Sequence, residues 1–128
     1  MPQLDDVFVC ESVSVDAATN RLSLFLLANE NWPVRKFPHL VAQMAVVSNW
    51  QFATEDQGHD FQVCSKVTLP DGQSSELRQN VTPAASGFLR CLAYFVGVNV
   101  SGPGPLTFDI SLNGQPMATK VIEIQQGD

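Results

Sequence analysis

Residues 32–39, WPVRKFPH, combine side chains that could recognise a partner. Trp32 and Phe37 are aromatic, Arg35 and Lys36 are cationic, and His39 carries an imidazole. Tryptophan and arginine are enriched at the energetic centres of protein interfaces, and long loops on rigid scaffolds often bind. The segment therefore predicts a binding site made by these five residues. The alternative is that Trp32 and Phe37 close one open end of the fold while the two cations stay in water.

A second polar cluster, Glu55-Asp56-Gln57-Gly58-His59-Asp60, offers oxygen and imidazole ligands of the kind that hold a divalent cation. It lacks the alternating Asp/Asn spacing of a calcium-binding loop, and the chain's 2 histidines cannot build a three-histidine site. We therefore expect a solvated turn, with neither a metal nor a cofactor. A hydrolase would need a deep pocket lined by at least two of His39, His59, Asp56 and Asp60.

Nucleophilic catalysis has no recognisable starting point in the chain. No G-x-S-x-G motif occurs, and the glycines of SGPGP at 101–105 precede a predicted strand rather than a helix that could hold phosphate. Cys10 and Cys91 lie in apolar runs, whereas Cys64 falls on the polar face of its segment and is the thiol expected to be accessible. We therefore predict that the protein is not an enzyme.

Charge and cysteine content restrict the partners and the compartment. The formal net charge of −6 repels phosphate backbones, and Arg35 and Lys36 are the sole adjacent cations, so nucleic acid is a poor partner. The first residues have no basic start and no long apolar stretch, from which we expect neither a signal peptide nor a membrane anchor. Three widely spaced cysteines fit reduced thiols, so we predict a cytoplasmic protein.

Apolar and polar residues alternate with a period of two through most of the chain, which is typical of strands with one buried face. The clearest pair is 106–112 and 115–124, joined by Asn113-Gly114, a dipeptide that tolerates the positive φ angles of a type I′ turn. A two-residue loop predicts a register for this hairpin: Ile110 opposite Met117, Phe108 opposite Thr119, Leu106 opposite Val121, Lys120 diagonal to Asp109, and Glu123 ending the apolar face. Pro116 predicts that residues 115–117 lie on a sheet edge.

Other signals mark the remaining connections. Residues 69–72, LPDG, suit a type I turn, and residues 16–20, DAATN, suit a turn in which Asp16 accepts backbone N–H bonds and Asn20 is left-handed. Pro33 and Pro38 predict an irregular connection over residues 28–39. The nearly continuous apolar run 88–100 predicts a strand in the middle of a sheet or buried on both faces.

The pattern predicts about eight strands. They lie at residues 7–15, 21–28, 40–50, 60–69, 73–81, 88–100, 106–112 and 115–124. The start of 40–50 also suits a helix, but Val46, Val47 and Trp50 favour a strand. We therefore predict an all-β fold, a single-domain antiparallel β-sandwich over residues 1–128, with immunoglobulin-like and jelly-roll topologies both open.

Several residues occur in an arrangement that resembles a family of small uncharacterised bacterial proteins. They are Cys10-Glu11, Asp16, Arg21-Leu22-Ser23-Leu24, Phe37-Pro38 and Pro70-Asp71-Gly72. The resemblance spans most of the chain. It implies a bacterial cytosolic domain of unknown function, and no catalytic residue comes with it.

The absence of a catalytic set favours a non-enzymatic binding or assembly module. Its loops or an exposed sheet face would engage another protein or a second copy of the chain, and residues 32–39 are the first candidate. The alternative is a small-ligand or carbohydrate-binding domain that uses the same aromatic residues and the acidic segment 55–60. We expect no nucleic acid and no membrane among the partners.

Overall fold

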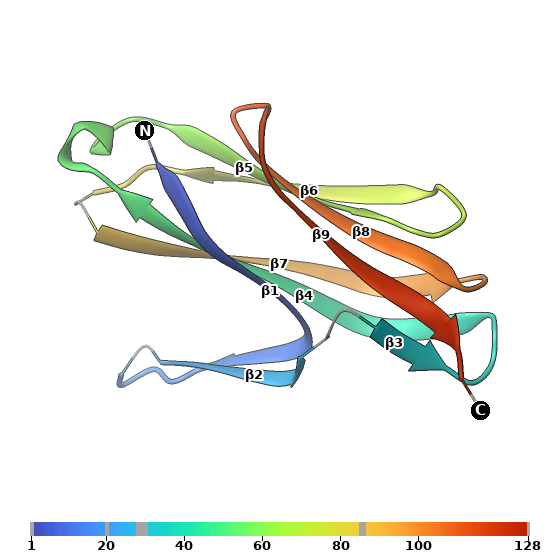
Figure 1. Ribbon diagram of the computed structural model, residues 1–128. Helices are drawn as coiled ribbons and strands as arrows, with labels where there is room; N and C mark the ends of the chain where they lie inside the picture. The colour runs from blue at the N-terminus through green and yellow to red at the C-terminus, as the bar shows by residue number, and fades with distance from the viewer. Residues whose placement is uncertain (1, 20, 28–30, 85–86, 128) are drawn as a thin grey trace.

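The computed structural model describes residues 2–19, 21–27, 31–84 and 87–127, and this part of the chain forms two β-sheets with no α-helix (Figure 1). One sheet has four strands in the order β2-β1-β4-β7, and the other has five in the order β3-β9-β8-β5-β6. The elements are β1 (Gln3–Val15), β2 (Leu22–Leu27), β3 (Asn31–Val34), β4 (His39–Phe52), the 3-10 helix η1 (Thr54–Asp56), β5 (Phe61–Thr68), β6 (Ser74–Val81), β7 (Gly87–Val100), β8 (Gly104–Leu112) and β9 (Gln115–Gln126). The prediction of an all-β fold is confirmed, and a strand lies at each of the eight predicted places.

The two sheets bury one hydrophobic core between them. Met44, Trp50, Phe108 and Ile122 come from both sheets, and none is more than 2% exposed. The Trp50 indole Nε1 donates a hydrogen bond to Ser48 Oγ at 3.0 Å, which satisfies the single polar group of that ring. Burial of each such side chain contributes about 1.5–3 kcal/mol, so this core makes the sheets a rigid support for the surface.

Two predicted hairpin turns are confirmed. Asn113 and Gly114 have φ angles of 49° and 82°, as a type I′ turn requires. In the other turn the Gly72 N–H donates to the Leu69 carbonyl at 2.9 Å, and Gly72 has a φ of 93° that suits glycine. These turns connect β8 to β9 and β5 to β6.

The connection between β1 and β2 is also a turn, as predicted. Asp16 Oδ1 accepts the Ala18 N–H at 2.8 Å, and the Asp16 N–H donates to the Arg21 carbonyl at 2.9 Å. The predicted left-handed conformation of Asn20 lies outside the described residues.

The predicted register between β8 and β9 is wrong because the ladder contains a β-bulge. Next to the turn Leu112 lies opposite Gln115 and Ser111 opposite Pro116, but Ile110 then lies opposite Ala118. Met117 is therefore an extra residue on β9. Proline has no N–H for the ladder, and bulges are one of the few places in a sheet that accept it. On the side of β9 away from β8, the described pairing with β3 covers only Glu123 to Gln126. Residues 115–117 have no described strand on that side, so their predicted edge position is confirmed.

The bulge exchanges the two faces of β9. Ile122 and Ile124 are buried, whereas Val121 and Glu123, which were predicted on the apolar face, are exposed. Asp109 lies opposite Thr119 and accepts its hydroxyl hydrogen bond at 2.7 Å, and the predicted diagonal contact with Lys120 is absent. Lys120 instead extends toward β1, where its Nζ donates to the Val7 carbonyl at 3.5 Å.

The prediction that residues 88–100 form a central or doubly buried strand is wrong. Strand β7 is an edge strand and pairs with β4 alone among the described strands. Cys91, Ala93 and Phe95 point into the core, whereas Phe88 and Val96 on the opposite face are 80% and 77% exposed. Strand β4 has the buried environment predicted for β7, since successive residues such as Val46 and Val47 are both buried.

The prediction that residues 28–39 contain no regular element is wrong for part of this segment. Asn31 to Val34 form β3, which runs parallel to Glu123 to Gln126 of β9. Pro33 is tolerated because β3 is the outer strand of its sheet, where an N–H facing away from the ladder is not needed. The parallel pair also means that the fold is not purely antiparallel.

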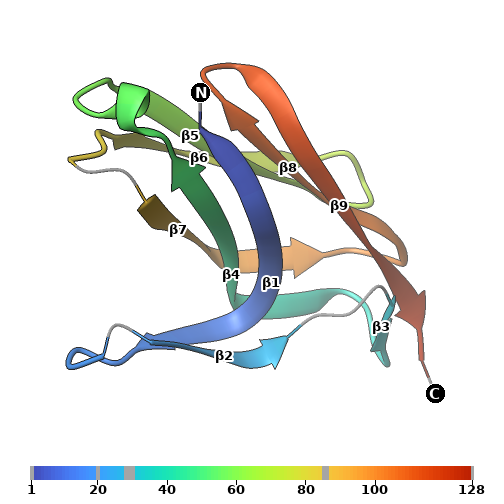
Figure 2. The same ribbon diagram turned by 60° about the vertical axis from the view of Figure 1, so that its left-hand side comes forward.

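Strand β1 takes part in two different pairings. Gln3 to Cys10 pair with β4, and Cys10 to Val15 pair with β2. In both views the β1–β2 hairpin, at one edge of the four-stranded sheet, lies below β4 and β7 on the side away from the five-stranded sheet (Figures 1 and 2). Val13 of this hairpin packs against a small second cluster formed by Cys10, Ala45 and Val47. The hairpin therefore covers part of this outer face of the four-stranded sheet and leaves the rest open.

Candidate protein-binding surface

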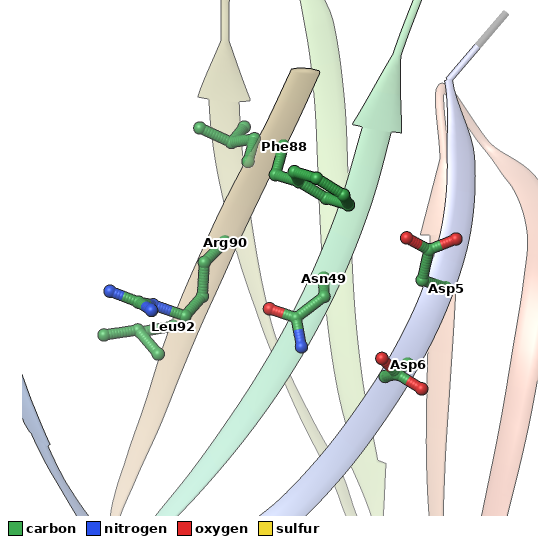
Figure 3. A pocket seen from close by; sticks show the side chains of 7 residues that line it. Asp5, Asp6, Asn49, Phe88, Arg90 and Leu92 are labelled. Atoms are coloured by element: carbon green, nitrogen blue, oxygen red, sulfur yellow. The ribbon is translucent and has the colours of Figure 1, made fainter. Parts of the chain in front are cut away.

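The open part of the outer face contains a groove of about 530 Å³, which we call the outer-face groove (Figure 3). It is lined by Asp5 and Asp6 of β1, Asn49 of β4, and Phe88, Leu89, Arg90 and Leu92 of β7. Leu89 packs against the core, so its neighbours Phe88 and Arg90 lie on the outer face. Phe88 and Arg90 of β7 therefore share one surface with the acidic residues of β1.

Two acidic side chains line the groove along β1. The register between β1 and β4 shifts between Leu4 and Asp6, so Asp5 is the extra residue of a β-bulge. In Figure 3 the carboxylates of both Asp5 and Asp6 lie beside the groove. The bulge therefore places two consecutive negative charges next to one surface.

A cation lies on the other side of the groove. Asn49 is opposite Asp6 on β1 and opposite Arg90 on β7, so the three residues form one row across the sheet. Neighbouring strands are about 4.8 Å apart, which separates the backbones of the two charged residues by about 10 Å. The row offers an anion, an amide and a cation, with the aromatic ring of Phe88 beside them (Figure 3).

The polar side chains of this groove carry charges of both signs. They are two carboxylates, one amide and one guanidinium, and the lining includes no cysteine, histidine, serine or threonine. An exposed aromatic ring beside charges of both signs is a typical anchor for a protein partner.

The predicted binding residues 32–39 lie at the other end of the fold. Trp32 and Phe37 are half-buried and pack against the core, and the rings of Trp32 and His39 meet edge to face with centroids 6.0 Å apart. Arg35 and Lys36 are exposed, and the Gln126 Nε2 donates to the Arg35 carbonyl at 2.6 Å. The structure packs Trp32 and Phe37 against the core and leaves the two cations in water, which is the arrangement expected if these two rings close one end of the core. A binding role for these five residues stays a prediction.

The acidic segment 55–60 is organised by its own backbone. Asp56 is buried, and its Oδ2 accepts the Ala53 N–H at 2.8 Å, which holds the start of η1. Asp60 accepts a hydrogen bond from Thr82 Oγ1. Among the described residues no three His, Cys, Asp or Glu side chains gather to hold a metal ion. Sequence reasoning missed the capping role of Asp56, which lies three residues after the N-cap Ala53, where an acidic side chain can accept the backbone N–H of the N-cap.

The two histidines do not support a hydrolase site. His39 begins β4, whereas His59 follows η1, beyond the other end of the same strand. Because β4 is 14 residues long, the two imidazoles cannot line one pocket.

The pKa values of all three cysteine thiols are raised in this environment. Burial raises the pKa of the Cys10 and Cys91 thiols. Burial, followed by the hydrogen bond and negative charge of Glu76, raises the pKa of the Cys64 thiol, whose Sγ lies 3.5 Å from Glu76 Oε2. Cys64 is half-buried while the other two are buried, so the prediction that it is the most accessible thiol is confirmed.

The residues of the outer-face groove were missed at the level of sequence because β7 was assigned to a sheet interior. One signal could have found them. Arg90 interrupts an otherwise apolar run, and an arginine is rarely buried in a strand that is covered on both faces. Arg90 therefore marks the face of β7 that meets water.

The fold and the surface define a two-sheet, all-β protein with an exposed groove on its four-stranded sheet. The chain belongs to the family of unknown function DUF6941, whose model matches residues 5–125. This match confirms the resemblance to an uncharacterised family. No curated protein matches the chain. None of the described helical segments is long and apolar enough to cross a membrane.

Proposed function

We propose that this protein is a non-enzymatic protein-binding or assembly module that engages its partner through the outer-face groove. The observation that carries the proposal is the exposure of Phe88, which is 80% accessible at one side of the groove. Transfer of an aromatic ring from water into an apolar contact is favourable, so a partner that buries the ring gains binding free energy. Contiguous exposed apolar surface on a folded chain commonly marks an interaction site.

The scaffold of the module is one domain over residues 1–128, which we interpret as a β-sandwich of immunoglobulin-like or jelly-roll type. Three free cysteines support a reducing compartment and hence a cytoplasmic location. The formal net charge of −6 disfavours nucleic acid, and the acidic side of the groove favours a partner with a basic side chain near an apolar one.

Site-specific photo-crosslinking in the source cells tests this proposal. A photoreactive benzoylphenylalanine at position 88 would lie in the groove, and the same residue at position 121 is a matched control. Val121 is 44% exposed on β9 of the other sheet. We expect protein adducts at position 88 and none at position 121. Equal adduct patterns at the two positions, or none at position 88, would contradict the proposal.

A small-ligand or carbohydrate-binding module is the alternative function. It predicts that position 88 yields no protein adduct while a panel of sugars raises the melting temperature, since a ligand at about 100 times its Kd adds roughly 2.7 kcal/mol of stability.

A further inference from the structure

A second surface lies along β6, the last strand of the five-stranded sheet. Most of its residues are polar, and most are exposed. Lys66 of β5 is opposite Asp109 of β8 on one side and opposite Glu76 of β6 on the other. The row across this sheet is therefore negative, positive and negative, and it stops at Glu76 with no further described strand.

The charges along β6 also alternate. Glu76 and Arg78 are two residues apart on the same face, and Arg78 Nη2 contacts Glu76 Oε1 at 2.9 Å. Both side chains are well exposed, at 43% for Glu76 and 60% for Arg78. An exposed pair of this kind adds little to the stability of the fold, so the strand gains little from it within one chain.

The backbone of β6 presents unpaired groups at the same residues. The Leu69 N–H donates to the Gln73 carbonyl at 2.7 Å, so Gln73 directs its backbone groups toward β5. In an antiparallel ladder alternate residues point the same way, which assigns Ser75 and Leu77 to β5 and leaves Glu76 and Arg78 facing the free edge. Glu76 and Arg78 therefore carry the charges of β6 and also direct their backbone N–H and C=O groups toward its free edge.

An antiparallel copy of β6 satisfies both sets of groups. When a two-fold axis passes through Leu77, Glu76 of one chain lies opposite Arg78 of the other, and the reverse pair forms at the same time. Those two residues would exchange their backbone N–H···O hydrogen bonds. Arg78 of the second chain would then follow Asp109, Lys66 and Glu76 in the row of alternating charges. Charges of one sign on an edge strand prevent pairing, but alternating charges make the strand complementary to itself.

The neighbouring surface would be covered by the same contact. Gln79 Nε2 donates to the Leu92 carbonyl at 2.8 Å, which ties β6 to β7 near this level. A groove of about 350 Å³ follows between residues 73–77 and 94–99, and it includes Leu77, Tyr94 and Val96, which are 39%, 40% and 77% exposed. A second chain at the β6 edge would remove part of this apolar surface from water.

We infer that the free edge of β6 is a homodimerisation site, at which two copies of the chain pair antiparallel around Leu77 with Glu76 and Arg78 as reciprocal cross-strand partners. The site is distinct from the outer-face groove and does not depend on the function proposed for it.

Charge reversal with sedimentation equilibrium tests this inference on the full chain. We expect the native protein to form a dimer. Glu76→Arg and Arg78→Glu should each weaken it by at least about 100-fold, because two pairs of like charges would then meet in each symmetric dimer. A mixture of the two variants should dimerise, since both cross-strand pairs are then opposite in sign, and the double variant should do so as well. Glu123→Arg and Arg35→Glu are controls with the same change of charge elsewhere, and they should leave the dimer intact.

Hydrogen exchange gives an independent measurement that does not require the variants. The Glu76 and Arg78 amides should exchange slowly at concentrations where the dimer forms and quickly on dilution, while the Lys66 amide within the sheet should not change. A native protein that stays monomeric at millimolar concentration would overturn the inference. A dimer that the single variants do not weaken, or that the mixture does not restore, would overturn it equally.

Discussion

Residues 32–39 and strand β7 both carry aromatic side chains next to cations, yet they use them differently. Phe37 lies in the connection between β3 and β4, and Trp32 lies in β3, the short outer strand of its sheet. Both rings turn inward onto the core, whereas Phe88 in β7 stays in water. Phe37 can fold over the end of the core because its backbone is not tied to a ladder. The side chains of a strand alternate between the two faces of a sheet, so Trp32 is on the core face of β3 and Phe88 is on the outer face of β7. An aromatic residue exposed on the face of a strand away from the core is a sign of a partner, and the following predictions test this difference.

The largest expected effect is on partner binding at β7. Phe88→Ala should weaken the interaction that crosslinking at position 88 detects by about 30-fold, corresponding to about 2 kcal/mol for an interface anchor. Lys36→Ala, in the other region, should change it by less than about twofold. The measurement is titration of each purified variant with the captured partner. The comparison fails if Lys36→Ala has the larger effect.

Folding stability should show the opposite order. Trp32→Ala should lower the free energy of unfolding by about 2 kcal/mol, because a half-buried ring leaves the core end, while Phe88→Ala should change it by less than about 0.5 kcal/mol. Urea denaturation followed by tryptophan fluorescence from Trp50 gives both values. If Phe88→Ala lowers the free energy of unfolding as much as Trp32→Ala does, the Phe88 side chain is buried in solution.

Thiol reactivity compares a half-buried cysteine, Cys64, with Cys91 in the core. Because burial raises the pKa of all three thiols, alkylation should be slow at neutral pH and should accelerate as the pH rises above the ordinary value of 9.0. Cys64 should react first, and Cys91 should react only when the protein unfolds. Mass spectrometry of peptides after iodoacetamide treatment measures the order. Cys91 labelling ahead of Cys64 in the native protein would contradict the assignment of its side chain to the core.

The smallest expected effect lies in the turn between β1 and β2, which has no aromatic residue. The backbone N–H groups of Ala18 and Thr19 lower the pKa of Asp16 below its ordinary value of 3.8. Its contribution to stability is therefore complete above that value and disappears as the pH falls through the lower, folded-state pKa. Asp16→Asn should reduce the melting temperature slightly at pH 7, and the difference from the native protein should vanish in strong acid. A difference that grows toward low pH would contradict the sign of this shift.

Local chemistry was sufficient for much of the fold. Asn113-Gly114, Leu69 to Gly72 and Asp16 all form the turns that their residue types require, because a turn depends on a few adjacent dihedral angles. Alternation of apolar residues located the strands, since one face of each must be buried. The resemblance to an uncharacterised family was confirmed as well.

The candidate site was not predictable in the same way. Asp6 and Asn49 are 43 residues apart in the sequence, and Asn49 and Arg90 are 41 apart. They are neighbours because β1, β4 and β7 lie side by side in the sheet. The apolar run of β7 suggested a buried strand, because hydrophobicity reports what a residue would prefer and not whether another element covers it. For Trp32 and Phe37 the sequence left two positions open, a binding loop or the end of the core, and the structure packs both against the core.

Residue types and their period of two therefore established an all-β chain, its turns and the places of eight strands, because these depend on neighbours along the backbone. The tertiary structure added the bulge at Met117, the parallel pairing of β3, the edge position of β7 and the hairpin beneath the outer face. Each of these arises from competition among strands for hydrogen-bonding edges and for the same core, and that competition involves residues far apart in the chain.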